Sequence, residues 1–187
     1  IHSASSALVY NIPIEEVTPD MRRIAKVLNF GVIYGLSAHG ITRQTNLSQR
    51  QGKKFIEIYF DKYPGIKDYL EDIKEKCRNN GYVETLLGRR RYLNDINSSN
   101  HRIRSQAERA AINMPIQGTA ADIVKIAMIN IQKRIDELHM ETLMILQVHD
   151  ELIFDTPNDE IKQIESIITE LMPTAVSLSV PLTVELN

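Results

Sequence analysis

The sequence has 187 residues, of which 43% are hydrophobic and 25% charged, and a net charge of −2. This length suits one compact domain or two small subdomains, and the composition is typical of soluble globular proteins. No apolar stretch approaches the ~18–20 residues that span a bilayer, and no signal peptide is visible. Cys77 is the single cysteine, which excludes an internal disulfide and fits a reducing compartment. Because the chain starts at Ile1 rather than Met, we expect processing or truncation.

Charge is distributed unevenly along the chain. Residues 1–110 hold 18 Lys and Arg against 12 Asp and Glu, whereas residues 111–187 hold 4 against 12. A basic half suits phosphate binding, and an acidic half can hold divalent cations. A chance distribution over a solvated surface is the alternative.

The first half predicts helices followed by a hairpin. Thr18 as N-cap and Pro19 in the first turn predict a helix that runs to about Tyr34 and stops at Gly35. Residues 48–79 predict one or two amphipathic helices, interrupted near residues 63–65. Residues 81–86 and 90–93 then predict the two strands of a hairpin, and the polar residues 94–100 a loop.

The second half predicts helices packed on an antiparallel sheet. We expect a helix from about His101 to Met114, a break or kink at Pro115, and another helix over 119–139. Leu143–Val148 and Leu152–Asp155 predict two mostly buried strands joined by a tight turn. Residues 158–172 predict a helix, and Val180–Leu186 a last strand that stops at the chain end. The predicted class is α+β.

A stripe of cations and aromatic rings marks the helix expected over 19–35. Arg22, Lys26, Phe30 and Tyr34 are spaced by four, so they share one broad helical face. Arginine and lysine bind phosphate oxygens, and the rings can stack on a base or cover a sugar. The stripe therefore has the layout of a nucleoside triphosphate. An ordinary amphipathic helix with aromatic core residues is the alternative.

A second candidate lies between the strands at His149-Asp150-Glu151. Carboxylates beside an apolar sheet are costly unless they are paired or bind a cation. Oxygen ligands of this kind suit Mg²⁺, which binds through one or two carboxylates together with substrate phosphates. Because Asp is also a common turn residue, a plain turn is the alternative.

A third candidate is a basic and amide-rich stretch. Six arginines between 89 and 109 suit contact with a nucleic-acid backbone, or else form a solvated charged face. Arg109 and Asn113 share a helical face, and Gln117 follows just after the expected break. Asn and Gln both donate and accept, so they can probe minor-groove edges, although helix capping is the alternative.

Four stretches together resemble DNA polymerase family A, of the DNA polymerase I type. RRIAKVLNFGVIYG at residues 22–35 resembles the motif B or O helix, whose pattern Arg-x3-Lys-x3-Phe-x3-Tyr-Gly is matched throughout. VHDE at 148–151 resembles motif C, and TLLGRRRYL at 85–93 and AERAAINMPIQGTAAD at 107–122 resemble further signatures of the family. The resemblance runs nearly from end to end, in the family's order.

The resemblance implies roles for individual residues. Arg22, Lys26 and His2 would contact the dNTP triphosphate, and Lys26 is also the candidate proton donor to the leaving pyrophosphate. Taken alone, His2 reads as a frayed terminal residue. The remaining implied roles are Phe30 against the sugar and base, Tyr34 at the template insertion site, Asp150 as a metal ligand, Glu151 as a less direct catalytic assistant, and Arg89, Arg109, Asn113, Gln117 and His149 on the primer–template.

The same resemblance implies an architecture and a reaction. Residues 1–100 would form a helical fingers subdomain, and 101–187 a partial palm with an antiparallel sheet packed by helices. The reaction would be template-directed transfer of a nucleotide from dNTP to a primer 3′ hydroxyl at two Mg²⁺ ions. The family's first catalytic Asp motif is missing, since only Ile1 precedes His2. We have no reason to assign Asp122 to that role, so we expect the chain alone to be nearly inactive and to need the rest of the polymerase, including the motif A strand and thumb.

Two other functions remain open. A non-catalytic nucleic-acid-binding module would explain the basic region but has no need of the acidic hairpin, and an unrelated helical domain would leave the cation and aromatic stripe unexplained. The resemblance implies no membrane association and a place in the bacterial cytoplasm at the nucleoid, with a phage-infected cell or an organelle also possible, in replication or repair. Phe30 implies poor use of dideoxynucleotides by the full-length enzyme.

Overall fold

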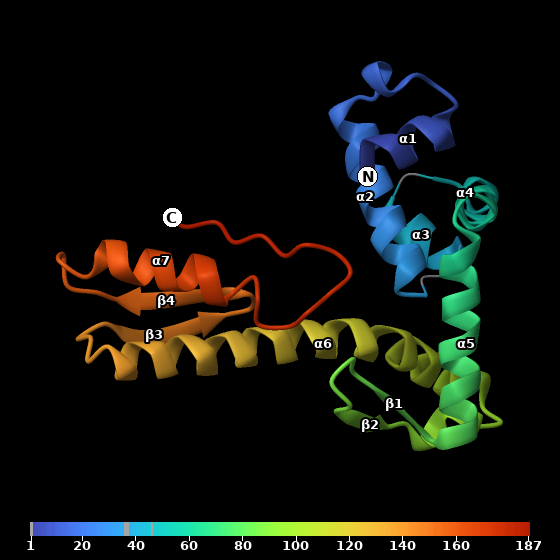
Figure 1. Cartoon of the computed structure of the whole chain (residues 1–187). Helices are drawn as coiled ribbons and strands as arrows, with labels where there is room; N and C mark the ends of the chain where they lie inside the picture. Colours follow the sequence, from blue (N-terminus) through green and yellow to red (C-terminus); the bar gives the residue numbers. More distant parts are fainter. Residues whose placement is uncertain (1, 36–37, 46) are drawn as a thin grey trace. The chain divides into compact units, whose positions relative to one another are not determined.

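The computed structural model describes residues 2–35, 38–45 and 47–187. Its helices and two small antiparallel hairpins confirm the predicted α+β class (Figure 1). The chain forms two compact units, one made of Ile1–Glu84 with Arg90–Pro115 and the other of Thr85–Arg89 with Ile116–Asn187. This division does not follow the boundary expected after residue 100, and the assignment of fingers and palm stays a prediction.

Local sequence signals explain the helix that carries the cation and aromatic stripe. The Thr18 hydroxyl accepts a hydrogen bond from the Met21 amide at 3.3 Å, and Pro19 occupies the first turn, as predicted. Gly35 ends this helix at a φ of +72°, where a side chain would be strained. The elements up to this point are α1 (His2–Tyr10), the short 3-10 helix η1 (Ile14–Glu16) and α2 (Pro19–Ile33).

The next helices also follow their capping signals. Ser48 and Gln51 form a reciprocal capping box, and the break expected at residues 63–65 falls between α4 and α5. Gly81 caps the end of α5 at a φ of +78°. The elements are α3 (Ala38–Gln44), α4 (Gln49–Lys62), α5 (Pro64–Asn80), the paired strands β1 (Tyr82–Glu84) and β2 (Arg90–Tyr92), and a 3-10 turn η2 (Asn94–Asn97) inside the expected loop.

Two apolar clusters support this first unit. One joins α2, α3 and α4 through buried residues such as Leu28, Ile41 and Phe55. The other joins α5, the β1 strand and the start of the next helix around Cys77, which is fully buried. The first cluster fixes α2 by packing along one side, where Leu28 and Val32 are buried.

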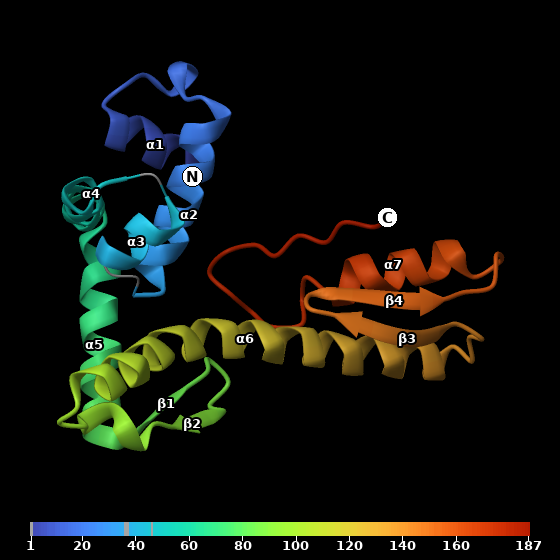
Figure 2. The ribbon, with the colours of Figure 1, turned by 180° about the vertical axis from the view of Figure 1, so that it is seen from behind.

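The expected break at Pro115 is wrong. Helix α6 runs without interruption from His101 to Glu137 (Figure 2). Pro115 lies inside this helix and is the last residue of the first unit in the sequence. A proline in a helix interior costs about 3 kcal/mol, because it removes a hydrogen bond and crowds the preceding turn. Buried residues such as Ala111 before it and Ile131 after it anchor both halves in apolar clusters. Tertiary packing therefore outweighs the local penalty.

The second unit is a hairpin and a helix packed on the later part of α6. Its elements are β3 (Leu143–Val148), β4 (Glu151–Asp155) and α7 (Ile161–Leu171), close to the predicted ranges. Ile131 and Ile135 of α6 pack with buried isoleucines of α7, and half-buried Phe154 joins them from the sheet. Glu160 accepts hydrogen bonds from the Thr142 amide and hydroxyl, so the start of β3 is tied to the start of α7.

Two expectations for this unit are wrong. The strands are not mostly buried, because Ile145 is 58% exposed and Val148 40% exposed, and only one face of the sheet packs against the helices. Residues 180–186 form no strand in the part of the chain described. Their alternating pattern persists and Val184 packs on the unit's core, but β3 and β4 pair only with each other and Pro181 has no amide to donate.

Candidate nucleotide-binding and metal-binding sites

The stripe on α2 lies on the open side of the helix, as predicted. Arg22, Lys26 and Phe30 are exposed and Tyr34 is half-buried, whereas Leu28 on the opposite side is 1% exposed. The Phe30 and Tyr34 rings stack, with centroids 6.3 Å apart and planes 12° from parallel. Two cations are therefore followed by a continuous aromatic surface along one helix.

His2 belongs to this surface and is not frayed. It lies in α1, its ring is 5.5 Å from the Phe30 ring, and its Nδ1 is 3.0 Å from the Nδ2 of Asn29. The pKa of His2 is lowered by burial and then by positive charge, including that of Arg22 and Lys26. A neutral imidazole therefore stands beside the two cations.

Asn29 is the residue that the sequence reasoning missed. It is 3% exposed, and its Nδ2 donates to the Ser5 hydroxyl at 3.0 Å. Ser6, from the same turn of α1, is fully buried. The signal was present in the sequence, because a single amide on the apolar side of an amphipathic helix needs polar partners from another element.

The end of α2 meets α6 at the predicted DNA-contacting residues. A Cβ added to Gly35 would lie 3.4 Å from side-chain atoms of both Arg109 and Ile112. The exposed guanidinium of Arg109 donates to the Ser105 hydroxyl at 3.0 Å. One turn on, Asn113 is half-buried, and its Oδ1 has no hydrogen-bond partner among the described residues.

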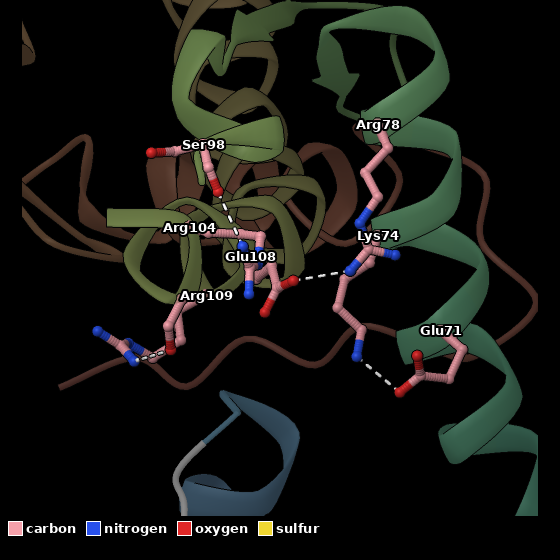
Figure 3. Close-up of polar contacts among 8 residues, drawn as sticks. Glu71, Lys74, Arg78, Ser98, Arg104, Glu108 and Arg109 are labelled. Atoms are coloured by element: carbon pink, nitrogen blue, oxygen red, sulfur yellow. Dashed lines mark hydrogen bonds and ion pairs between the residues drawn. The ribbon is translucent and has the colours of Figure 1, made fainter. Parts of the chain in front are cut away.

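A neighbouring ion pair fixes α6 against α5. Arg78 of α5 donates to Glu108 of α6 at 2.7 Å, while Arg109 points away from that pair (Figure 3). Arg104 donates to the Ser98 carbonyl at 2.8 Å, which holds the loop before α6. Of the six arginines from 89 to 109, Arg104 thus has a structural contact.

Arg89 also has a structural contact, in the second unit. Its Nε donates to Asp122 at 2.7 Å and its NH2 group to the Gly118 carbonyl at 3.0 Å, although half of the side chain stays exposed. Burial raises the pKa of Asp122, but hydrogen bonds from Thr85 and Arg89 and the charge of Arg89 outweigh it, so the net pKa is lowered. Asp122 is therefore held in an ion pair with Arg89.

The acidic turn is built as a two-residue hairpin loop. Val148 pairs with Glu151, which leaves His149 and Asp150 in the turn, and His149 has a φ of +55°. The Gln147 amide donates to the His149 carbonyl at 2.9 Å. Asp150 and Glu151 are both exposed, and among the described residues neither has an ion-pair partner. They line an open groove that α7 and the C-terminal segment also border.

The predicted site residues fall into two groups. The first unit holds His2, the four stripe residues, Arg109 and Asn113, and the second holds Arg89, Gln117, His149, Asp150 and Glu151. Gln117 is exposed on α6. The described residues contain no cluster of three or more His, Cys, Asp or Glu that would hold a metal ion. None of the described helices combines the length and the apolar character needed to cross a membrane.

Comparisons with known proteins all identify relatives in the same protein family. A sequence model described as DNA polymerase family A matches residues 1–187. DNA polymerase I of Bacillus caldotenax is 46% identical over 185 residues, which is 99% of this chain and 21% of that protein. DNA polymerase I of Mycobacterium leprae (strain TN) is 46% identical over 187 residues, 100% of this chain and 20% of the relative. The chain thus spans about a fifth of the length of these curated relatives.

The fold is similar to a solved polymerase structure. The POL domain of Pol1 from M. smegmatis, in complex with a DNA primer-template and dNTP, superposes with a TM-score of 0.90 at 45% sequence identity. The match covers 97% of this chain and 32% of that one.

Proposed function

The chain belongs to DNA polymerase family A, and we propose that it forms part of the catalytic core of a DNA-directed DNA polymerase. In this role it helps to transfer nucleotides from dNTPs to a primer 3′ hydroxyl, as the template directs. The observation that carries the proposal is the open face of α2, where Arg22 and Lys26 precede the stacked rings of Phe30 and Tyr34. Charge followed by flat apolar surface suits a nucleoside triphosphate.

On the nucleotide side, each residue acts through its own chemistry. Arg22 and Lys26 bind phosphate oxygens, and Lys26 gives a proton to the leaving pyrophosphate. Phe30 packs against the sugar and base, and Tyr34, half-buried at the end of the helix, contacts the template base that is to be copied. His2, which lies against Phe30, adds a further hydrogen bond to the phosphates.

On the DNA side, the two units contribute separately. Arg109 and Asn113 of the first compact unit, and Gln117, Arg89 and His149 of the second, contact the primer–template. The exposed guanidinium of Arg109 and the half-exposed side chain of Arg89 support this role. We assign residues 1–100 to the fingers subdomain and 101–187 to a partial palm.

The acidic turn fits a hard divalent cation. Asp150 and Glu151 offer carboxylate oxygens free of any described ion pair, unlike Asp122. Asp150 would hold Mg²⁺ directly, and Glu151 would assist less directly. When bound, a pair of such ions stabilises the charge that develops as phosphoryl transfer proceeds. The described residues hold no group of three or more possible metal ligands, so the proposal takes the partner aspartate from another part of the polymerase.

Primer extension tests the proposal. The full-length polymerase that contains this chain should extend a primer with Mg²⁺ and all four dNTPs, and its Asp150→Ala variant should not. The 187-residue chain alone should show almost no extension. Extension by the isolated chain that depends on Asp150 would contradict the need for a second aspartate from elsewhere. Tight primer–template binding without extension by the full-length protein would favour the non-catalytic binding module. For such an enzyme we infer a place in the bacterial cytoplasm, at the nucleoid.

A further inference from the structure

Asn29 occupies an unusual position for an amide side chain. It lies on the buried side of α2, beside Leu28 and one turn before Val32, and only 3% of it is exposed. Its Nδ2 reaches two atoms of α1, the Nδ1 of His2 and the hydroxyl of Ser5, each at 3.0 Å. A buried amide costs free energy unless it is satisfied, so its partners give the reason for its presence.

The orientation of the amide follows from a count of donors and acceptors. As placed, Nδ2 donates to the Ser5 hydroxyl and lies 3.0 Å from the Nδ1 of His2, which can accept its other hydrogen, and one buried oxygen, Oδ1, has no partner among the described residues. The reversed amide would turn Oδ1 towards His2 and Ser5 and leave two buried hydrogens in its place. An unsatisfied carbonyl oxygen costs less than two unsatisfied donors, so the observed orientation is favoured.

This orientation decides which nitrogen of His2 carries the proton. An amide nitrogen only donates, so the Nδ1 of His2 must accept, and the neutral ring carries its hydrogen on Nε2. We propose that Asn29 is a positioning residue that holds His2 as the Nε2–H tautomer, so that His2 presents a donor to a triphosphate bound along α2. The ligand in this statement rests on the proposed function, whereas the tautomer rests on the contacts alone.

The charges around His2 support a neutral ring. Burial lowers its pKa first, followed by positive charge that includes Arg22 and Lys26 on α2. The other face of the ring lies against Phe30, which is uncharged. A neutral Nε2–H ring donates to phosphate without adding a third cation to this surface. The Nδ1–H tautomer would instead point a lone pair at the phosphate oxygens.

The proposal predicts how His2 responds to pH. With Asn29 in place, Nε2 keeps its hydrogen both in the imidazolium and in the neutral ring, so the donor survives as pH rises through the pKa of His2. In an Asn29→Asp variant, the carboxylate accepts from Nδ1–H and raises the pKa of His2. Above that raised pKa, the hydrogen stays on Nδ1, and Nε2 no longer donates.

The first measurement determines the His2 tautomer and does not depend on primer extension. Nitrogen NMR of the full-length polymerase with ¹⁵N-labelled histidine, in the absence of nucleotide, reports each ring nitrogen separately. The His2 signals are assigned by their loss in His2→Ala. At a pH above the pKa of His2 we expect Nε2 to be protonated and Nδ1 to be bare. A protonated Nδ1 in the unmodified protein would overturn the proposal.

The second measurement reads the consequence for dNTP. We expect Asn29→Leu to raise the KM for dNTP about tenfold, the loss of one hydrogen bond to a charged group, with a smaller change in kcat. For Asn29→Asp we expect kcat/KM to fall as pH rises through the raised pKa, a step that the unmodified enzyme lacks. In a His2→Ala background, both effects of the Asn29 substitutions should disappear.

The background comparison separates positioning from simple packing. If the Asn29 substitutions weaken dNTP use equally with and without His2, Asn29 only supports the fold and the proposal is wrong. If the unmodified polymerase extends no primer, the proposed function fails, while the NMR result still decides the tautomer. Ser5→Ala is the matched control, since it removes the other partner of Asn29 and should leave the His2 tautomer unchanged.

Discussion

The face of α2 and the β3–β4 turn are built in opposite ways. On α2, the proposed ligand-binding residues stand on a helix whose other side is buried, and a second helix adds His2 through the buried Asn29. At the turn, Asp150 and Glu151 stand exposed on a two-stranded hairpin that packs on one face only. On our proposal, the residues of the first surface lie within one unit, whereas the second needs metal ligands from elsewhere in the polymerase.

This difference follows from what each ligand requires. Phosphates and a base spread over several ångströms, so a single stripe of side chains along one helix can meet them. A divalent cation needs several oxygens around one point, and one turn provides few of them. If the proposed function is right, a segment of this kind can carry most of a nucleotide-binding surface and only part of a metal centre.

The largest expected effect comes from the turn. Asp150→Ala in the full-length polymerase should lower kcat about 10³-fold, because loss of a metal ligand removes several kcal/mol of charge stabilisation in the transition state. Steady-state primer extension measures it. Since Asp150 is exposed, stability should be unchanged, which thermal unfolding would show. Asp159→Ala, which removes another exposed carboxylate of the same unit, is the control and should keep full activity.

The next effect tests whether the α2 face is specific. Lys26→Ala should lower kcat/KM for dNTP by about 10²-fold, since it removes both a phosphate contact and the proposed proton donor. Arg23→Ala is the matched control, because Arg23 is exposed on the same helix but pairs with Asp20 at 3.2 Å. Equal losses for the two variants would mean that α2 acts through general positive charge, as a simple nucleic-acid binder would.

A smaller effect concerns the ion pair that ties residues 85–89 to α6. Asp122→Ala should reduce local stability by about 1–2 kcal/mol. We expect a small value because the Arg89 side chain is half exposed, so water screens the ion pair. The lowered pKa means that Asp122 contributes stability above its ordinary pKa of 3.8, and that this is lost as pH falls through the folded value. Protection of the amides of residues 85–89, taken relative to the intrinsic exchange rate at each pH, should thus fall below about pH 4 in the unmodified protein, and far less in the variant. Asp136→Ala, an exposed acid of α6, is the control.

Most of the fold could be predicted from local signals. The cap at Thr18, the stop at Gly35 and the break before Pro64 each act within one turn of chain, and all three were predicted correctly. Pro115 was misread because the packing that holds both halves of α6 is not local. The strand predicted over 180–186 failed for a related reason, since alternation in a sequence does not reveal a pairing partner.

The site divides in the same way. The stripe on α2 is visible in the sequence because a spacing of four needs only helix geometry. The contact between Asn29 and His2 joins residues 27 positions apart, and the sequence contains no periodic pattern that predicts it. The exposure of the β3–β4 strands was misjudged because an apolar strand has the same composition whether or not a neighbour covers it. Long-range contacts, rather than residue types, were what the sequence concealed.

The smallest expected effect tests whether α6 helps to hold the α2 face in place. Gly35→Ala should destabilise the first unit by about 1 kcal/mol, because a φ of +72° strains any side chain, while the new Cβ would only touch Arg109 and Ile112 at 3.4 Å. Gly65→Ala makes the same chemical change in α5, where a Cβ meets nothing within 4 Å, and should be neutral or stabilise slightly. Hydrogen exchange along α2 measures both. If Gly35→Ala loosens α2 and also raises the KM for dNTP, the contact with α6 sets the geometry of the nucleotide-binding face. If exchange changes but KM does not, α2 owes its arrangement to its own core, and the contrast with the dependent acidic turn becomes sharper.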